Sequence, residues 1–154
     1  MQKLPENIFT CVVKYTPLIS IDFIIENEKG FFLLGKRKNP PAKGFYFVPG
    51  GRILKGETLK QAFERISNQE LGIKLNIEKA KFLGVYEHFY HNSFISEKVS
   101  THYIVLAYKL KLINSLNNLP KDQHFNYKWF SRQELLESKE VHYYTKLYFK
   151  EAVK

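Results

Sequence analysis

Apolar residues in this chain recur with two periods, the 3.6-residue period of a helix and the two-residue period of a strand. The helical period is clearest over 58–71, where one face collects Leu59, Ala62, Phe63 and Ile66. Thr58 and Gln61 have the spacing of a capping box, and Gly72 follows at the position of a C-terminal stop. We therefore predict a helix over 58–71.

The remaining apolar runs are short, and turn residues separate most of them, a pattern typical of strands joined in hairpins. Strands are predicted over 18–26, 31–37, 45–48, 82–91, 99–112 and 127–130. Further helices are predicted over 4–15, 132–138 and 142–152. Pro49, Gly50 and Gly51 break the strand pattern after 45–48. One long helix between groups of strands predicts the α+β class or a mixed-sheet sandwich.

Composition is that of an ordinary globular protein. The chain has 154 residues, 44% of them hydrophobic, and we expect a single domain over 1–154 because no repeat or linker divides it. The single cysteine, Cys11, excludes a disulfide framework and a cysteine-based zinc site. The sequence contains no apolar run of about 18 residues and no basic start followed by an apolar block at its N-terminus. We expect a soluble, cytoplasmic protein without a membrane partner.

The formal charge of +9 points to a polyanionic partner. Only four of the 24 basic residues are arginines, and three of these fall close together, namely Arg37, Arg52 and Arg65. The planar fork of arginine suits phosphate and carboxylate groups. A non-catalytic nucleic-acid-binding protein is an alternative explanation of the charge. However, the lysines are scattered and no nucleic-acid-binding module is present, so we expect no nucleic-acid partner.

One acidic side chain extends the apolar face of the predicted helix. Glu70 follows Ile66 by four residues and Phe63 by seven. A carboxylate in such a place must be paired, hydrogen-bonded or bound to a metal. An ion pair with Arg65, or an acid facing water at the helix end, remains an alternative. Glu57, just before the helix, is either a solvated acid favoured by the helix dipole or a functional group.

The spacing of these residues resembles the Nudix box, the loop–helix–loop signature of hydrolases that act on nucleoside diphosphates linked to another group. The matching positions are Gly51, Glu57, Arg65, Glu70, Gly72 and Ile73. The usual box also has a glutamate after the arginine and a pair of glutamates near the helix end. Here Ile66 and Gln69 replace two of these glutamates, and Ser67 replaces an aliphatic residue.

The lost glutamates bear on the chemistry. Paired carboxylates hold two or more Mg²⁺ ions, which activate a water molecule to attack phosphorus. A helix with one inward acid can help to hold a single hard cation but lacks that cluster. The protein is therefore either an inactive relative or the catalyst of a different reaction.

The modified box resembles one branch of the superfamily, the GDP-mannose mannosyl hydrolases, and the likeness extends over nearly the whole chain. It includes Phe-Val-Pro-Gly-Gly-Arg at 47–52, Leu-Leu-Gly-Lys-Arg at 33–37, His-Phe-Tyr at 88–90, Thr-His-Tyr at 101–103 and Gln-His at 123–124. The resemblance implies the Nudix fold, a mixed β-sheet sandwiched between α-helices. It also implies Mg²⁺-dependent hydrolysis, with Mn²⁺ as a substitute, of GDP-mannose or of GDP-glucose.

In that branch, water attacks the anomeric carbon with inversion and releases GDP and free sugar. The resemblance implies catalytic roles for His124, Asp22, Arg37, Arg52 and Tyr103. His124 is the expected general base, since a near-neutral pKa suits that task, although a lone loop histidine is often only solvated. Asp22 would steady positive charge at the anomeric carbon. The two arginines would neutralise the leaving diphosphate, or else they are surface charge.

The same resemblance implies the binding residues. The expected substrate contacts are Lys3, Leu4, Phe9, Arg37, Arg52, Arg65 and His88, with Phe9 stacking on guanine. The expected Mg²⁺ ligands are Glu70, Gln123 and the backbone carbonyl of Gly50. Pairing with Glu70 is a second possible role for Arg65, and His91, His102 and His142 receive no role. A homodimer is implied as well.

The alternative enzyme is a Nudix pyrophosphohydrolase that cleaves a P–O bond of a nucleotide sugar or nucleoside triphosphate.

Overall fold

A mixed β-sheet forms the centre of the structure, a computed structural model that describes residues 3–113, 116, 119, 120 and 124–150. Its main path runs β3-β2-β1-β6-β5, with β4 paired to β1 and β7 paired to β2. The strands are β1 Leu18–Glu26, β2 Phe32–Arg37, β3 Tyr46–Phe47, β4 Gly50–Arg52, β5 Lys81–Tyr90, β6 Thr101–Lys111 and β7 His124–Phe130. β1 pairs with β6 in parallel along its whole length, and the other ladders are antiparallel.

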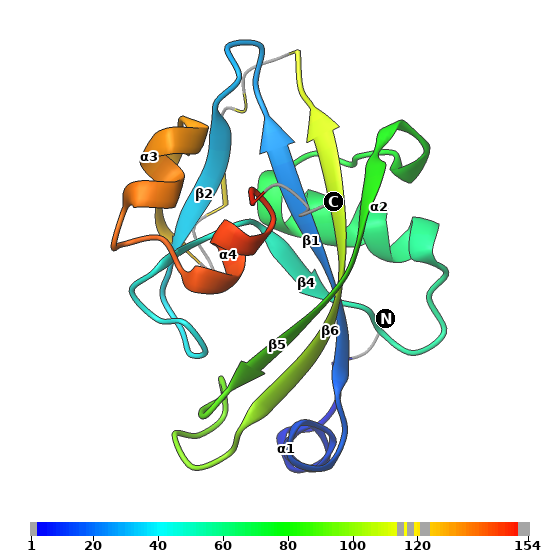
Figure 1. Cartoon of the computed structure of the whole chain (residues 1–154). Helices are drawn as coiled ribbons and strands as arrows, with labels where there is room; N and C mark the ends of the chain where they lie inside the picture. The colour runs from blue at the N-terminus through cyan, green and yellow to red at the C-terminus, as the bar shows by residue number, and fades with distance from the viewer. Residues whose placement is uncertain (1–2, 114–115, 117–118, 121–123, 151–154) are drawn as a thin grey trace.

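Helices cover both faces of this sheet (Figure 1). They are α1 Glu6–Tyr15, α2 Leu59–Leu71, α3 Arg132–Glu137 and α4 Tyr143–Leu147, with a short 3-10 helix at Ile77–Lys79. α2 lies on one face and α3 and α4 on the other, while α1 lies at the lower end beside the β5–β6 hairpin (Figure 1). No helix in the described part of the chain has the length and apolar character needed to cross a membrane.

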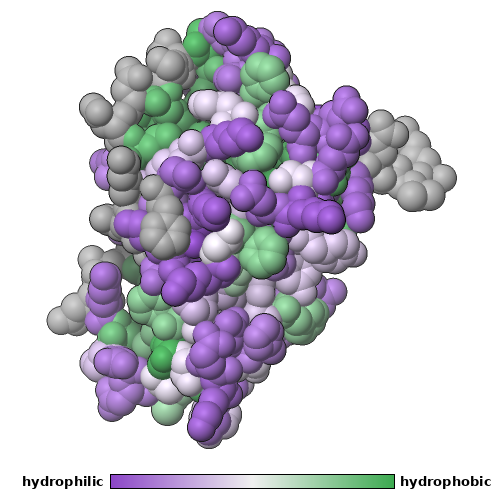
Figure 2. Space-filling view, turned by 90° about the vertical axis from the view of Figure 1, so that its left-hand side faces the viewer, coloured by the Kyte–Doolittle hydropathy of each residue, from purple (hydrophilic) through white to green (hydrophobic). Residues whose placement is uncertain are grey.

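Strand β1 separates two hydrophobic cores. Ile21, Phe23 and Ile25 pack with α2, whereas Ile24 belongs to the core beneath α3 and α4. This division is the two-residue alternation that its sequence predicts. It also sends Asp22 to the α4 side, because Asp22 shares the face of Ile24. On the outer surface seen in Figure 2, hydrophilic side chains dominate and apolar ones form separate patches.

The predicted long helix is confirmed in detail. Thr58 caps α2 and Gln61 completes the capping box, so two orphan backbone N–H groups are bonded reciprocally. Gly72 ends the helix with φ of 75°, a left-handed conformation that glycine adopts without steric cost. On the buried face, the ring of Phe63 meets the ring of Phe23 edge to face at a centroid distance of 4.9 Å.

Two sequence-based boundaries are wrong in ways that affect the site. The Pro-Gly-Gly break contains the short strand β4, because Gly50 and Gly51 pair with Asp22 and Ile21 of β1. A Cβ atom on Gly50 would collide with the Asp22 carboxylate, so only glycine fits there. β7 begins at His124, three residues earlier than predicted. His124 is therefore a buried strand residue with 1% exposure, and the interpretation of a solvated loop histidine is wrong.

The two terminal helices are shorter than predicted. α1 begins at Glu6, because its N-cap residue Pro5 has a non-helical ψ of 146°. α4 ends at Leu147, since Tyr148 and Phe149 donate their backbone N–H groups to carbonyls three residues earlier, which tightens the last turn. The last two residues of the predicted helix over 142–152 lie outside the described residues.

Replacing Phe63 by alanine should lower the free energy of unfolding by about 3–5 kcal/mol, because the side chain is fully buried between α2 and the sheet. Urea titration of the variant measures this change. Phe94→Ala is the matched control, since Phe94 is 62% exposed, and its expected effect is below about 0.5 kcal/mol. Equal losses in the two variants would contradict the assignment of the core.

Candidate active site

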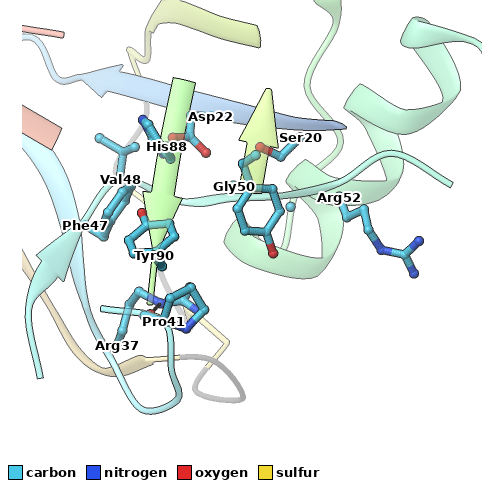
Figure 3. A pocket seen from close by; sticks show the side chains of 12 residues that line it. Ser20, Asp22, Arg37, Pro41, Phe47, Val48, Gly50, Arg52, His88 and Tyr90 are labelled. Atoms are coloured by element: carbon cyan, nitrogen blue, oxygen red, sulfur yellow. Dashed lines mark hydrogen bonds between the residues drawn. The ribbon is translucent and has the colours of Figure 1, made fainter. Parts of the chain in front are cut away.

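A pocket opens beside β1 and β4 and is lined by residues from six strands, β1 to β6, and from the loop after β2 (Figure 3). Six residues expected from the sequence to act in the site line it: Asp22, Arg37, Gly50, Arg52, His88 and Tyr103. These residues are up to 81 positions apart in the chain. The pairing of β1 with β4 and β6, and of β6 with β5, brings most of them together, and Arg37 comes from the end of β2. The geometry therefore assembles one polar site from scattered sequence positions.

The two arginines approach this pocket from different elements. Arg37 ends β2, and its Nε donates a 2.9 Å hydrogen bond to the Pro41 carbonyl. Arg52 ends β4, and its guanidinium carbon lies 4.7 Å from the ring centroid of Phe9 on α1. Figure 3 shows the two side chains on opposite sides of the view. A group with two phosphates would meet a cation at either side.

Burial adjusts the polar groups near these arginines. Desolvation lowers the pKa of Arg52 from its usual value, and the nearby Tyr103 opposes that shift. Desolvation also raises the pKa of Tyr103, so its hydroxyl stays protonated and able to donate. The Phe9 ring, expected to stack on guanine, covers the Arg52 guanidinium in this structure. A desolvated guanidinium has fewer competing waters and so binds an anion more strongly.

Asp22 forms a buried hydrogen-bonded group with two aromatic residues. Tyr148 donates its hydroxyl proton to Asp22 Oδ2 at 2.5 Å, and the Tyr148 hydroxyl oxygen lies 3.2 Å from His88 Nε2. Burial raises the pKa of Asp22 to about 7, opposed by the Tyr148 hydrogen bond and by Arg37. Burial lowers the pKa of His88 to about 4, so His88 is neutral at pH 7. Tyr148 follows α4 and carries no sequence motif, which is why the sequence did not identify it.

Glu70 and His124 form a second polar pair next to the pocket. His124 Nε2 lies 3.3 Å from Glu70 Oε2. A carboxylate only accepts, so Nε2 carries the proton, and a neutral His124 keeps its lone pair on Nδ1. That nitrogen is buried and has no hydrogen-bond partner among the described residues. Gly35 makes room for the ring, since a Cβ at Gly35 would be 2.5 Å from Nδ1.

Arg65 pairs with Glu57 and not with Glu70, which corrects the predicted alternative for Arg65. Its Nε lies 2.5 Å from Glu57 Oε1, and its Nη2 donates to both Glu57 Oε2 and the Arg52 carbonyl. Nη1 donates to Gln69, one of the residues that replace the usual glutamates. The pair with Arg65 lowers the pKa of Glu57. Arg65 thus ties the loop after β4 to helix α2.

The remaining expected residues lie away from the pocket or outside the described chain. Lys3 and Leu4 precede α1, are exposed, and do not line the pocket. Glu70 and His124 adjoin it without lining it. Gln123 lies outside the described residues.

Glu70 is the acidic side chain of the helix that could help to hold a hard cation next to the pocket. In the described parts of the chain, no group of three His, Cys, Asp or Glu side chains has metal-binding geometry. Nonetheless, the charge of Glu70 raises the pKa of Asp22, so two carboxylates share this region. Within the described residues, the hydrogen bonds of these carboxylates to side chains are with Tyr148 and His124, neither of which is a permanent cation. Carboxylate and carbonyl oxygens are ligands that Mg²⁺ accepts.

Comparison with known families assigns the class. The family model of the NUDIX domain matches residues 16–150, and the chain belongs to this family. This membership confirms the predicted α+β Nudix fold. The assignment agrees with the geometry, because the matched segment contains the pocket, the helix of the box and both polar pairs.

The most informative relatives are a glycan biosynthesis protein and two hydrolases. Over 129 residues the chain is 40% identical to the low-salt glycan biosynthesis protein Agl8 of Haloferax volcanii, covering 83% of this chain and 80% of that protein. Over 71 residues it is 42% identical to an ADP-ribose pyrophosphatase of Methanocaldococcus jannaschii, and the match covers 46% of this chain and 40% of that protein. The crystal structure of a MutT NUDIX hydrolase from Burkholderia pseudomallei matches with a TM-score of 0.70 and 25% sequence identity. The match covers 87% of this chain and 96% of that hydrolase. Family and fold together make the chain a Nudix hydrolase.

The raised pKa of Asp22 should make stability depend on pH. The native state holds a proton that the unfolded state loses near pH 3.8, so the free energy of unfolding falls as the pH rises from about 4 to about 7. The slope is up to about 1.4 kcal/mol per pH unit. In Asp22→Asn this contribution is absent, and the difference between the two proteins isolates it. Urea titrations without divalent metal measure the effect, and parallel pH profiles would contradict it.

Proposed function

We propose that the protein hydrolyses a guanosine-diphosphate sugar of the GDP-mannose type at the bond between the anomeric carbon and the diphosphate. The products are GDP and free sugar with inverted configuration. GDP-glucose is the second candidate substrate. The observation that carries this proposal is the contact between Glu70 and His124, which puts a histidine beside the one acid that the helix offers at the site.

The rest of the helix supports chemistry at carbon. Ile66 and Ser67 are buried in the core where the usual box has an acid and an aliphatic residue. Gln69 is exposed and is bonded to Arg65. A single acid suffices to hold one cation but not to build a multi-metal cluster that activates water. Water must then be activated by a protein base, and the Nδ1 lone pair of a neutral His124 is such a base.

The pocket supplies the other needs of this reaction. As the water oxygen bonds to the anomeric carbon, its proton passes to His124 and the electron pair of the C–O bond moves to the departing diphosphate. Arg37 and Arg52 neutralise the charge that develops there, and Tyr103 donates a hydrogen bond. Asp22 faces the sugar and stabilises positive charge at carbon.

The proposal includes the metal and the remaining contacts. Glu70, Gln123 and the Gly50 carbonyl would hold Mg²⁺, with Mn²⁺ as a substitute, and the ion when bound would screen the negative diphosphate. Lys3, Leu4, Phe9, Arg65 and His88 would contact substrate in a homodimer of single-domain subunits. The name of Agl8 supports a role in glycan synthesis.

A P–O-cleaving pyrophosphohydrolase is the second candidate, favoured by the 71-residue match to an ADP-ribose pyrophosphatase. Hydrolysis of GDP-mannose in ¹⁸O-labelled water with Mg²⁺ distinguishes the two reactions, with a chelated sample as the blank. We expect label in the released mannose, because attack at carbon transfers the water oxygen to the sugar. Label in a phosphate product, detected by mass spectrometry, would overturn the proposal in favour of P–O cleavage.

His124→Ala should lower kcat by roughly 10²- to 10⁴-fold, the usual contribution of a general base. His91→Ala is the matched control, because His91 is exposed and outside the catalytic pocket, and its kcat should stay unchanged. Steady-state assays of GDP release compare the two. Full activity in His124→Ala would remove His124 from the mechanism.

A further inference from the structure

The hydroxyl of Tyr148 connects two pocket residues that come from different strands. Asp22 lies on β1, His88 lies on β5, and Tyr148 follows α4, 126 positions after Asp22. The hydroxyl oxygen is 2.5 Å from Asp22 Oδ2 and 3.2 Å from His88 Nε2. All three side chains are less than a tenth exposed. Within the described structure, this hydroxyl directly bridges the carboxylate and the imidazole.

Helix α4 holds this hydroxyl in place through neighbouring contacts. The ring of Tyr144 stacks on the His88 imidazole at 4.3 Å with an interplanar angle of 12°. Thr145 accepts a hydrogen bond from the backbone N–H of Val48, just before β4. The Tyr148 ring packs edge to face on Tyr86 of β5 at 4.7 Å. These contacts fix the helix to β5 and to the segment before β4, both of which contribute residues to the pocket.

The single proton of the hydroxyl sets the direction of both hydrogen bonds. An ionised Asp22 can only accept, so Tyr148 donates its proton to Oδ2. The tyrosine oxygen can then only accept from His88, which requires that His88 carry its proton on Nε2. With Oδ2 held in this way, Oδ1 lies against Gly50, another residue of the pocket wall.

We propose that Tyr148 is a positioning residue that fixes the orientation of Asp22 and the tautomer of His88 toward the sugar end of the pocket. This inference rests on the proposed function, which assigns Asp22 and His88 to the sugar. Tyr148 itself contacts the two protein groups and acts through them. Its contribution is to preorganise the carboxylate for the positive charge that forms only in the transition state.

The first test is the kinetics of Tyr148→Phe, which removes one oxygen atom and keeps the ring. We expect kcat for GDP-mannose to fall roughly ten-fold or more while KM changes less than about three-fold, because a group acting on the transition state alone changes kcat. Tyr143→Phe, at the start of α4 and 60% exposed, is the control with unchanged kcat. Wild-type kcat in Tyr148→Phe would overturn the inference.

A double-mutant cycle separates positioning from a general loss of structure. If Tyr148 acts through Asp22, the variant Tyr148→Phe/Asp22→Asn is no slower than Asp22→Asn alone. Multiplied losses in the double variant would overturn the inference, since they would show that Tyr148 acts independently of Asp22.

The tautomer of His88 gives a readout that does not depend on activity. Nitrogen-15 NMR of the intact protein at pH 8 should show His88 protonated on Nε2, and Tyr148→Phe should show a mixture of tautomers. A proton on Nδ1 in the wild type, or an unchanged tautomer in the variant, would overturn the inference. If the labelled-water experiment instead finds P–O cleavage, the proposed function fails while this NMR result still decides the role of Tyr148.

Discussion

The structure depends on burying one carboxylate in the middle of its central strand. Asp22 lies in β1, which is paired on both edges and covered by helices on both faces. An unpaired charge in such a place costs several kcal/mol, so the surrounding elements must supply partners or space. Tyr148 supplies a donor, and Gly50 leaves the space that a side chain would fill. The pocket therefore forms where the sheet accommodates this carboxylate.

The Nudix helix serves two separate purposes in this chain. At its start, the pair of Arg65 with Glu57 ties the loop after β4 to the helix, and the glutamine at position 69 joins that pair. At its end, Glu70 meets His124 from the sheet. Of the residues that replace the usual glutamates, Ile66 is buried in the core and Gln69 is bonded to Arg65, which leaves Glu70 as the acid of this helix next to the pocket. The proposed reaction, in which a protein base and not a metal cluster activates water, rests on that division.

The last helix is as much a part of the site as the box. Tyr144, Thr145 and Tyr148 each contact a strand that lines the pocket or the segment leading into it. These three residues are one, three and four positions apart in pairs, which places them on the side of the helix that faces the sheet. A short helix with ordinary composition can therefore determine how a distant carboxylate is oriented.

The sequence alone indicated most of the elements and the family, because hydrophobic period, capping residues and box spacing are local properties. It predicted the cap at Thr58 and the stop at Gly72, and the structure confirms both. Local patterns carry no information on partners far along the chain, so tertiary structure alone assigned Arg65 to Glu57, buried His124 against Gly35 and brought Tyr148 to Asp22. It also formed β4 from a Pro-Gly-Gly segment, since strand pairing with β1 outweighs the weak strand propensity of glycine.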